Sequence, residues 1–509
     1  MNTQLTPKPT LDKDLDKFAS VEEAASLLSR GLVAPGLALL FIALAAVLAT
    51  IAGAGLPDIV MIVAATAVAG YMALAIGAND VTNNVSAAVG AKALTIGSAL
   101  VIAAIFETAG ALIAGRNVVE TISSEIIPPH AISEPALLIV VMLSALLAAA
   151  LWVHIATWIG APVSTTHSIV GAVLGAGAAA LGVDAVNWWV VGAITMSWVI
   201  SPVIGALIAI IFLYLIKSTV IYRDDKIAAA RRWVPLHVAI MGGAFIAYLV
   251  EMLVPAKFAG QPAMIAGVFF PSMTVLWAIL HRVIAWQSVG LENRNQSLRV
   301  LFRVPLVASA ALLSFAHGAN DVANAVGPLA AIVTASQQGH FEGSISAPYW
   351  VMLVGALGIS VGLLLYGPKL VRMVGQQITR LNPVRGFCVA VSVAITVLFA
   401  SAIGMPVSST HIAVGAVFGV GFFREWYTAN SSRRRAYLAR RAAGKGDGKP
   451  NAPRPGRAPR VVPHTEVTRR RLVRSAHIAT MLAAWLITVP LSGALAAALY
   501  FGFSLAANR

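Results

Sequence analysis

The sequence predicts an all-α polytopic membrane protein with about 12–13 membrane elements, arranged as two inverted-topology repeats with re-entrant helical hairpins. Three observations support this fold class. Hydrophobic residues make up 58% of the chain and charged residues only 11%, whereas a soluble domain carries roughly 25% charged residues. Many apolar stretches are long enough to cross a bilayer core about 30 Å thick as helices. Two motifs of the first half return in the same order in the second half, which indicates internal duplication.

The apolar elements follow one another along most of the chain. They are expected at 31–53, 59–80, 97–115, 136–158, 161–180, 188–216, 235–254, 263–281, 305–322, 350–368, 386–403, 404–422 and 476–503. The two that begin near 161 and 404 are short and rich in glycine, as re-entrant segments are. The expected parts are a cytoplasmic leader at 1–30, an extra N-terminal helix at 31–53, repeat 1 at 59–216, a connecting region with two helices at 217–304, and repeat 2 at 305–503 with a basic cytoplasmic loop at 424–474.

Two motif pairs carry the evidence for duplication. The first is GANDVTN, which starts at Gly77, and GANDVAN, which starts at Gly318. The second is GAPVSTTHSIVGAVLGAG at 160–177 and GMPVSSTHIAVGAVFGVG at 404–421, with twelve identical residues in eighteen positions. Because two unrelated motifs keep their order and nearly their spacing, a duplicated unit is the simplest explanation.

Charge orients the repeats and excludes other classes. The loop at 116–135 is acidic and its counterpart at 369–385 is basic, and basic loops remain in the cytoplasm. The halves are therefore expected to be inverted, with the N-terminus in the cytoplasm and the C-terminus outside. The net charge of +15 is assigned to cytoplasmic loops, and no nucleic-acid partner is expected. Cys388 is the single cysteine, so no intrachain disulfide can form.

The GAND motifs place carboxylates inside apolar sequence. Asp80 and Asp321 each precede an asparagine at i+3, Asn83 and Asn324, on the same helical face. Ionisable residues in membrane segments are costly and are functional by default. Carboxylate, amide and hydroxyl oxygens suit a hard cation, so these four residues are candidates for binding one. The alternative is that they only form hydrogen bonds between helices.

The PVSTTH and PVSSTH motifs predict an anion site. Their hydroxyl residues lie where a helix begins, and a helix N-terminus favours anions such as phosphate. The substrate-binding candidates are Ser164, Thr165, Thr166, Ser408, Ser409 and Thr410, together with Asn79 and Asn320 of the GAND motifs. The alternative is that the hydroxyls only cap the hairpin helices. His167 and His411 are proton carriers or packing residues and are left out of the site.

A bound cation would explain why carboxylates accompany an anion site with almost no Lys or Arg. The cation neutralises both, and its co-movement supplies a driving force across the membrane potential. Glu107, in the apolar run IFETAGALIAG, is a further candidate for the coupling ion or a proton. It has no counterpart in the second half.

These motifs resemble the duplicated signatures of the PiT family of inorganic phosphate transporters, over roughly 59–216 and 305–503. The resemblance implies a cation-coupled phosphate symporter with two helical hairpins. It implies that Asp80, Asn83, Asp321 and Asn324 bind coupling ions and that the hairpin hydroxyls hold phosphate. The sequence departs from the family in the helix at 31–53, the long basic loop, and the stretch GFCVAVSVA near 386, which lacks an acidic residue found in some sodium-coupled relatives.

The sequence thus predicts a secondary active symporter that imports inorganic phosphate, with one half rocking against the other around the site. Sodium is favoured as the coupling ion and a proton remains open. A sulfate symporter of the same fold is the alternative, an anion channel is a weaker one, and no enzymatic activity or further cofactor is expected. The predicted surroundings are the lipid bilayer of a bacterial-type inner membrane. The oligomeric state is left open, with a homodimer among the options.

Overall fold

The computed structural model describes residues 32–128, 134–159, 163–254, 260–338, 345, 347–377, 382–443 and 475–507. Within these ranges the regular structure is helical, without strands. Every predicted apolar stretch falls on a helix, and ten helices are long and apolar enough to cross a membrane, or eleven if a bent pair is counted as one span. The chain is therefore a multi-pass membrane protein. The predicted leader and the 444–474 part of the basic loop lie outside the described residues.

The GAND motifs lie on long helices at the centre of the molecule. The central helices are α2 (Ile59–Gly90), α3 (Ile96–Ala114), α11 (Arg303–Asp321), α12 (Ala323–Gln338) and α13 (Tyr349–Gln377). The α2 helix continues ten residues beyond its predicted end at 80. Hydropathy falls at Asn79 and Asp80, but protein groups satisfy these side chains, so the polar residues do not end the helix.

Close backbone contacts hold the two halves together. The α2 helix of the first half packs on α13 of the second, and α3 packs on α11. A Cβ atom added to Gly77 would overlap the carbonyl oxygen of Ile359, and one added to Gly318 would overlap that of Glu107. Each GAND glycine thus permits a helix of the other half to approach its backbone, which is how small residues act at membrane helix interfaces.

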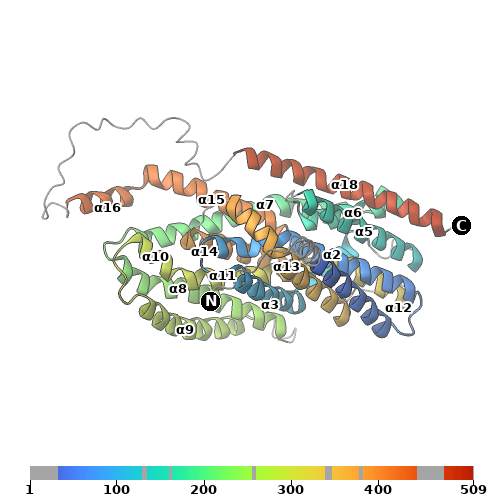
Figure 1. Ribbon diagram of the computed structural model, residues 1–509, viewed down its shortest axis with the longest axis horizontal. Coiled ribbons are helices and arrows are strands. Elements are labelled where there is room, and N and C mark those ends of the chain that lie inside the picture. Colours follow the sequence, from blue (N-terminus) through green and yellow to red (C-terminus); the bar gives the residue numbers. More distant parts are fainter. Residues whose placement is uncertain are drawn as a thin grey trace, which may run out of the picture.

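The hairpin motifs connect a long helix to a helix that begins inside the protein. The elements are α5 (Pro135–Ile159) with α6 (Thr165–Leu181), and α14 (Pro383–Ala402) with α15 (Ser409–Asn430). The α6 helix packs on α18 (Ser475–Ala507), which comes from the other half, and α15 packs on α7 (Trp188–Ile216) (Figure 1). The partners of both hairpins are therefore exchanged between the halves.

The remaining described helices include short segments packed on α12 and helices farther from the centre. They are the helix Leu32–Ala52, α4 (Arg116–Glu120), η1 (Thr121–Glu125), η3 (Val183–Ala185), η4 (Lys217–Ile221), α8 (Lys226–Leu253), α9 (Pro262–Gln287), α10 (Asn295–Leu301) and α16 (Ser432–Ala443). The α8 and α9 helices pack along each other at one end of the molecule (Figure 1). The most apolar stretch of α9 is not buried against the other described helices, as expected for a helix that faces lipid.

Buried apolar residues form two large clusters that do not follow the sequence halves. The first is built mainly from α2, α5, α6, α12 and α13, with Ala496 of α18. The second is built mainly from α7, α8, α11, α14 and α15. Each cluster contains one hairpin helix, and the polar site lies where the tips of the two hairpins meet.

Candidate functional site

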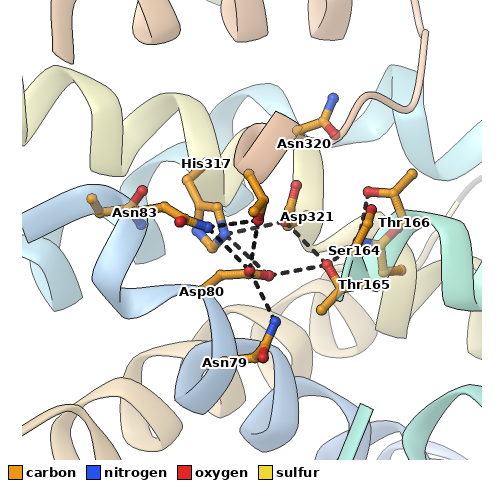
Figure 2. Close-up of polar contacts among 12 residues, drawn as sticks. Asn79, Asp80, Asn83, Ser164, Thr165, Thr166, His317, Asn320 and Asp321 are labelled. Atoms are coloured by element: carbon orange, nitrogen blue, oxygen red, sulfur yellow. Dashed lines mark hydrogen bonds and ion pairs between the residues drawn. The ribbon is translucent and has the colours of Figure 1, made fainter. Parts of the chain in front are cut away.

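The two GAND carboxylates come together in a buried cluster. Asp80 of α2 and Asp321 at the end of α11 are each about 1% exposed. Ligand atoms of Asp80, Asp321 and His317 all lie within 4.8 Å of one another. Figure 2 shows these side chains converging from α2 and α11 beside the start of α6. The prediction that the two motifs form one site is consistent with this geometry.

Asp80 is surrounded by donors from both halves. Its Oδ1 accepts hydrogen bonds from Asn79 Nδ2 (3.1 Å) and Asn83 Nδ2 (3.2 Å) of its own helix. The Thr410 hydroxyl, at the start of α15, also reaches Oδ1 (3.3 Å), and the Thr165 hydroxyl, at the start of α6, donates to Oδ2 (3.0 Å). One carboxylate therefore touches the tips of both hairpins.

One oxygen of the second carboxylate and one amide oxygen near it have no donor among the described residues. Asp321 Oδ2 lies 3.1 Å from His317 Nε2 and 3.4 Å from the Thr165 hydroxyl. Asp321 Oδ1 and Asn324 Oδ1 are buried and have no hydrogen-bond partner in the part of the chain described. Buried acceptors are normally satisfied, and oxygens of this type are the ligands of hard cations. The residues present therefore fit a bound cation.

The threonines of the hairpins connect the carboxylates to the helix starts. Besides both carboxylates, the Thr165 hydroxyl lies 3.4 Å from Asn324 Nδ2, and the Thr166 hydroxyl is at the same distance from it. Thr166 also donates to the carbonyl of Val407 in the other hairpin (3.1 Å), while Thr410 accepts from Asn83 Nδ2 (2.7 Å). The hairpin tips are thus cross-linked to each other as well as to the GAND helices.

Two hairpin serines cap helices. Ser164 Oγ accepts from the backbone N–H of His167 (3.2 Å) and Ser408 Oγ from that of His411 (3.3 Å). Both are N-caps, which is the alternative that the sequence left open for these two positions. A capping side chain satisfies only one of the first four N–H groups of a helix, so the N-termini of α6 and α15 keep donors for an anion. Ser409 is buried at the start of α15 without a described side-chain hydrogen bond.

The GAND asparagines that precede the carboxylates hold the hairpin backbones. Asn79 Nδ2 donates to the carbonyl of Val163 (3.2 Å). Asn320 Nδ2 donates to the carbonyl of Met405 (3.2 Å), and its Oδ1 accepts from the N–H of Val407 (3.2 Å). Their amide groups therefore fix the approach to each helix start, and a direct contact with substrate stays a prediction for both.

His317, which the sequence analysis did not single out, lies at the centre of the cluster. Its Nδ1 is 3.3 Å from Glu107 Oε1, and its Nε2 is 3.8 Å from Asp80 Oδ2. Glu107 also accepts a hydrogen bond from Asn84 Nδ2. The one signal in the sequence is a histidine inside an apolar run, directly before the second GAND motif, where the first motif has the apolar Ile76.

The polar group formed by Glu107, Asn84 and His317 has no polar equivalent at the corresponding positions of the opposite repeat. The carbonyls of Glu107 and Ile359 occupy equivalent places over Gly318 and Gly77, so Ile359 is the counterpart of Glu107. By motif alignment, Ala325 stands opposite Asn84. His317 likewise stands opposite Ile76 of the first half, so each of these three polar residues has an apolar counterpart and the site is chemically asymmetric.

Comparisons with known proteins agree with this site. A model described as the phosphate transporter family matches residues 76–496. The chain belongs to this family. A Helicobacter pylori (strain J99) relative named "Putative phosphate permease" is 45% identical over 428 residues, covering 84% of this chain and 80% of the relative. A Pyrococcus abyssi protein given the same description is 39% identical over 364 residues, covering 71% of this chain and 88% of its own.

A solved structure extends the agreement to three dimensions. It is described as "The sodium-dependent phosphate transporter" and superposes with a TM-score of 0.74 at 32% identity, covering 88% of this chain and 99% of that one. The all-helical fold and the family are thus established. Phosphate transport is the function of this family. The two hairpin histidines pack against aromatic rings, His167 on Trp198 and His411 on Trp485, with ring centroids 3.8 and 3.5 Å apart.

Proposed function

We propose that the chain is a secondary active symporter that imports inorganic phosphate together with a cation, and that sodium is this cation. The observation that carries the proposal is the placement of two carboxylates, with unpartnered oxygens beside them, at the starts of two hairpin helices. The carboxylates attract a cation, the helix starts attract an anion, and each bound ion lowers the cost of holding the other.

The charge balance of the site supports coupled movement. Among the ion pairs of the described residues, Asp80 and Asp321 are paired with His317 and with no Lys or Arg. A phosphate ion bound here would therefore lie beside two carboxylates, and no Lys or Arg is paired with these carboxylates to offset the negative charge. Moving one elementary charge across 100 mV is worth about 2.3 kcal/mol, so co-transported cations convert inward phosphate movement from an unfavourable step to a favourable one.

The chain architecture supports alternating access around this site. Motif pairs repeat in order, and contacts such as Gly77 with Ile359 and Gly318 with Glu107 recur as equivalent pairs. These pairs favour inverted repeats at 59–216 and 305–503, joined by the region at 217–304. By the positive-inside tendency, the basic loop and the N-terminus are cytoplasmic, and a bacterial-type inner membrane is the proposed location. A homodimer remains an option that no described contact addresses.

The test is uptake of labelled phosphate into proteoliposomes under an inward sodium gradient, then under an inward proton gradient at fixed internal pH. Sodium-driven uptake is expected, with less than a twofold effect of excess sulfate. The Asp80→Asn and Asp321→Asn variants are expected to lose gradient-driven uptake. The matched control is Asp184→Asn, which changes an exposed carboxylate in η3 and is expected to transport normally.

Each arm separates one alternative. Uptake driven only by protons would show that the coupling ion is the proton and not sodium. Strong inhibition by sulfate would show that the site does not select phosphate over sulfate. Unsaturable uptake that equilibrates without accumulation would indicate a channel. Normal accumulation by both carboxylate variants would refute the assigned site.

A further inference from the structure

A basic cavity lies away from the transport site, between α16 and the turn that precedes α8. Its volume is about 400 Å³, and its lining includes Tyr222, Arg223, Asp224, Ser432, Arg433 and Arg440. The first three belong to the turn and the others to α16. This cavity involves the start of the basic loop, which the transport function does not explain.

The α16 helix docks through one tyrosine. Tyr437 is 7% exposed, its hydroxyl accepts a hydrogen bond from Lys226 Nζ (2.7 Å), and its ring contacts that of Tyr222. Arg433 and Arg440 are seven residues apart, so they share one face of the helix. Both line the cavity, while Tyr437 anchors the helix to the body of the protein.

The cavity has more positive than negative charge. Three guanidinium groups line it, and Asp224 is the lining carboxylate. Asp224 forms an ion pair with Arg440 at 3.7 Å, and both side chains are more than half exposed, so this pair contributes little by itself. Arg223 and Arg433 have no carboxylate partner among the ion pairs of the described residues.

A buried cation behind the tyrosines adds to this field. Lys217 is 6% exposed, and its Nζ lies over the ring of Tyr427 at 4.3 Å from the centroid. Its charge interacts with those of Arg424, Arg434 and Arg385, and no carboxylate is among these interactions. Tyr427 in turn stacks on Tyr222, which lines the cavity. No carboxylate pairs with Lys217 among the ion pairs of the described residues, so its charge adds to the positive potential beside the cavity.

We propose that this cavity binds an anion with two or more neighbouring phosphoryl groups, held by Arg223, Arg433 and Arg440. Guanidinium groups bind phosphate oxygens in pairs of parallel hydrogen bonds. A volume of about 400 Å³ is in the range of small-molecule sites and exceeds what one phosphate ion needs. The same chemistry is present in a soluble polyphosphate and in a lipid headgroup with two phosphates.

The test uses the full chain in nanodiscs of zwitterionic lipid, titrated with tripolyphosphate in a calorimeter without any ion gradient. Arg433→Gln and Arg440→Gln are each expected to weaken binding at least tenfold. Arg435→Gln is the matched control, because it removes the same charge from an exposed position of α16 that does not line the cavity. It is expected to change binding less than threefold. Binding should persist in Asp321→Asn, which separates this site from the transport site.

A second arm distinguishes the lipid source. If tripolyphosphate does not bind, the same variants are compared for retention of cardiolipin during purification, measured by mass spectrometry. Retention that is lost in Arg433→Gln and Arg440→Gln but not in Arg435→Gln assigns the site to a lipid headgroup. Equal losses in all three arginine variants, or binding of neither probe, would overturn the proposal and leave an ordinary solvated basic helix.

Discussion

Replacing Thr165 by valine tests how the site is assembled, because one hydroxyl lies between the two carboxylates. The hydroxyl donates to Asp80 Oδ2 at 3.0 Å and lies 3.4 Å from Asp321 Oδ2. Valine keeps the volume and removes these contacts together with the 3.4 Å contact to Asn324 Nδ2. A hydrogen bond to a charged group contributes about 1.5–3 kcal/mol, and the longer contact is too stretched to add much. Because 1.4 kcal/mol is a factor of ten, we expect apparent phosphate affinity to fall roughly tenfold to a hundredfold.

The assay is the concentration dependence of sodium-driven phosphate uptake in proteoliposomes. Thr165→Ser keeps the hydroxyl and should recover most of the affinity. Thr66→Val is the matched control, since Thr66 is buried on α2 and its hydroxyl bonds only to the carbonyl of Ile62 in its own helix. If Thr165→Val transports with an affinity within twofold of the parent while Thr66→Val does the same, the hydroxyl does not organise the site and the reasoning fails.

Three further predictions concern the packing and charge of the core. Gly318→Ala should lower the free energy of unfolding by about 1–3 kcal/mol, because the new methyl group overlaps the backbone of Glu107. Thermal unfolding in detergent measures this change. Gly97→Ala is the control, because the space around Gly97 is open and the added methyl group causes no crowding. Glu107→Gln should reduce phosphate uptake at least tenfold, since the amide can still accept a hydrogen bond from Asn84 but places no carboxylate beside His317. Full activity would contradict this prediction. The control is Glu125→Gln, which changes an exposed carboxylate. The thiol of Cys388 is fully buried, so a polar maleimide should label it only after denaturation, and rapid labelling of the native protein would show that α14 opens.

The membrane fold could be predicted almost completely from the sequence. Each predicted apolar stretch lies on a helix, because in a bilayer the backbone must satisfy its own hydrogen bonds and long apolar runs have few other solutions. The boundaries were less predictable. The end of α2 was placed ten residues early because hydropathy falls at Asp80, yet the donors that satisfy this carboxylate come from residues distant in sequence, such as Thr165 and Thr410.

The carboxylates of the buried cluster could be selected from the sequence, Asp80 and Asp321 by their duplication and Glu107 as an acid in an apolar run, whereas His317 was missed. Asp80 and Asp321 stand out because each repeats the other, and the structure brings them together with Thr165. His317 has an apolar counterpart, Ile76, so the comparison of repeats gave no reason to select it. The roles of Ser164 and Ser408 as caps depend on which backbone N–H each hydroxyl faces, and this is decided by the tertiary arrangement of the hairpin.

The exchange of helix partners means that neither half of the chain is a self-sufficient folding unit. Residues 59–216 contain α6 without the α18 on which it packs, and residues 305–503 contain α15 without α7. Separated, each half would expose to lipid the glycine-lined surfaces at Gly77 or Gly318 that normally receive the other. Co-expressed, the two fragments carry mutually complementary faces and should find each other in the bilayer. A single break in the chain between 217 and 304 should then be tolerated as long as α8 stays attached to one fragment, because residues of α8 belong to the second apolar cluster.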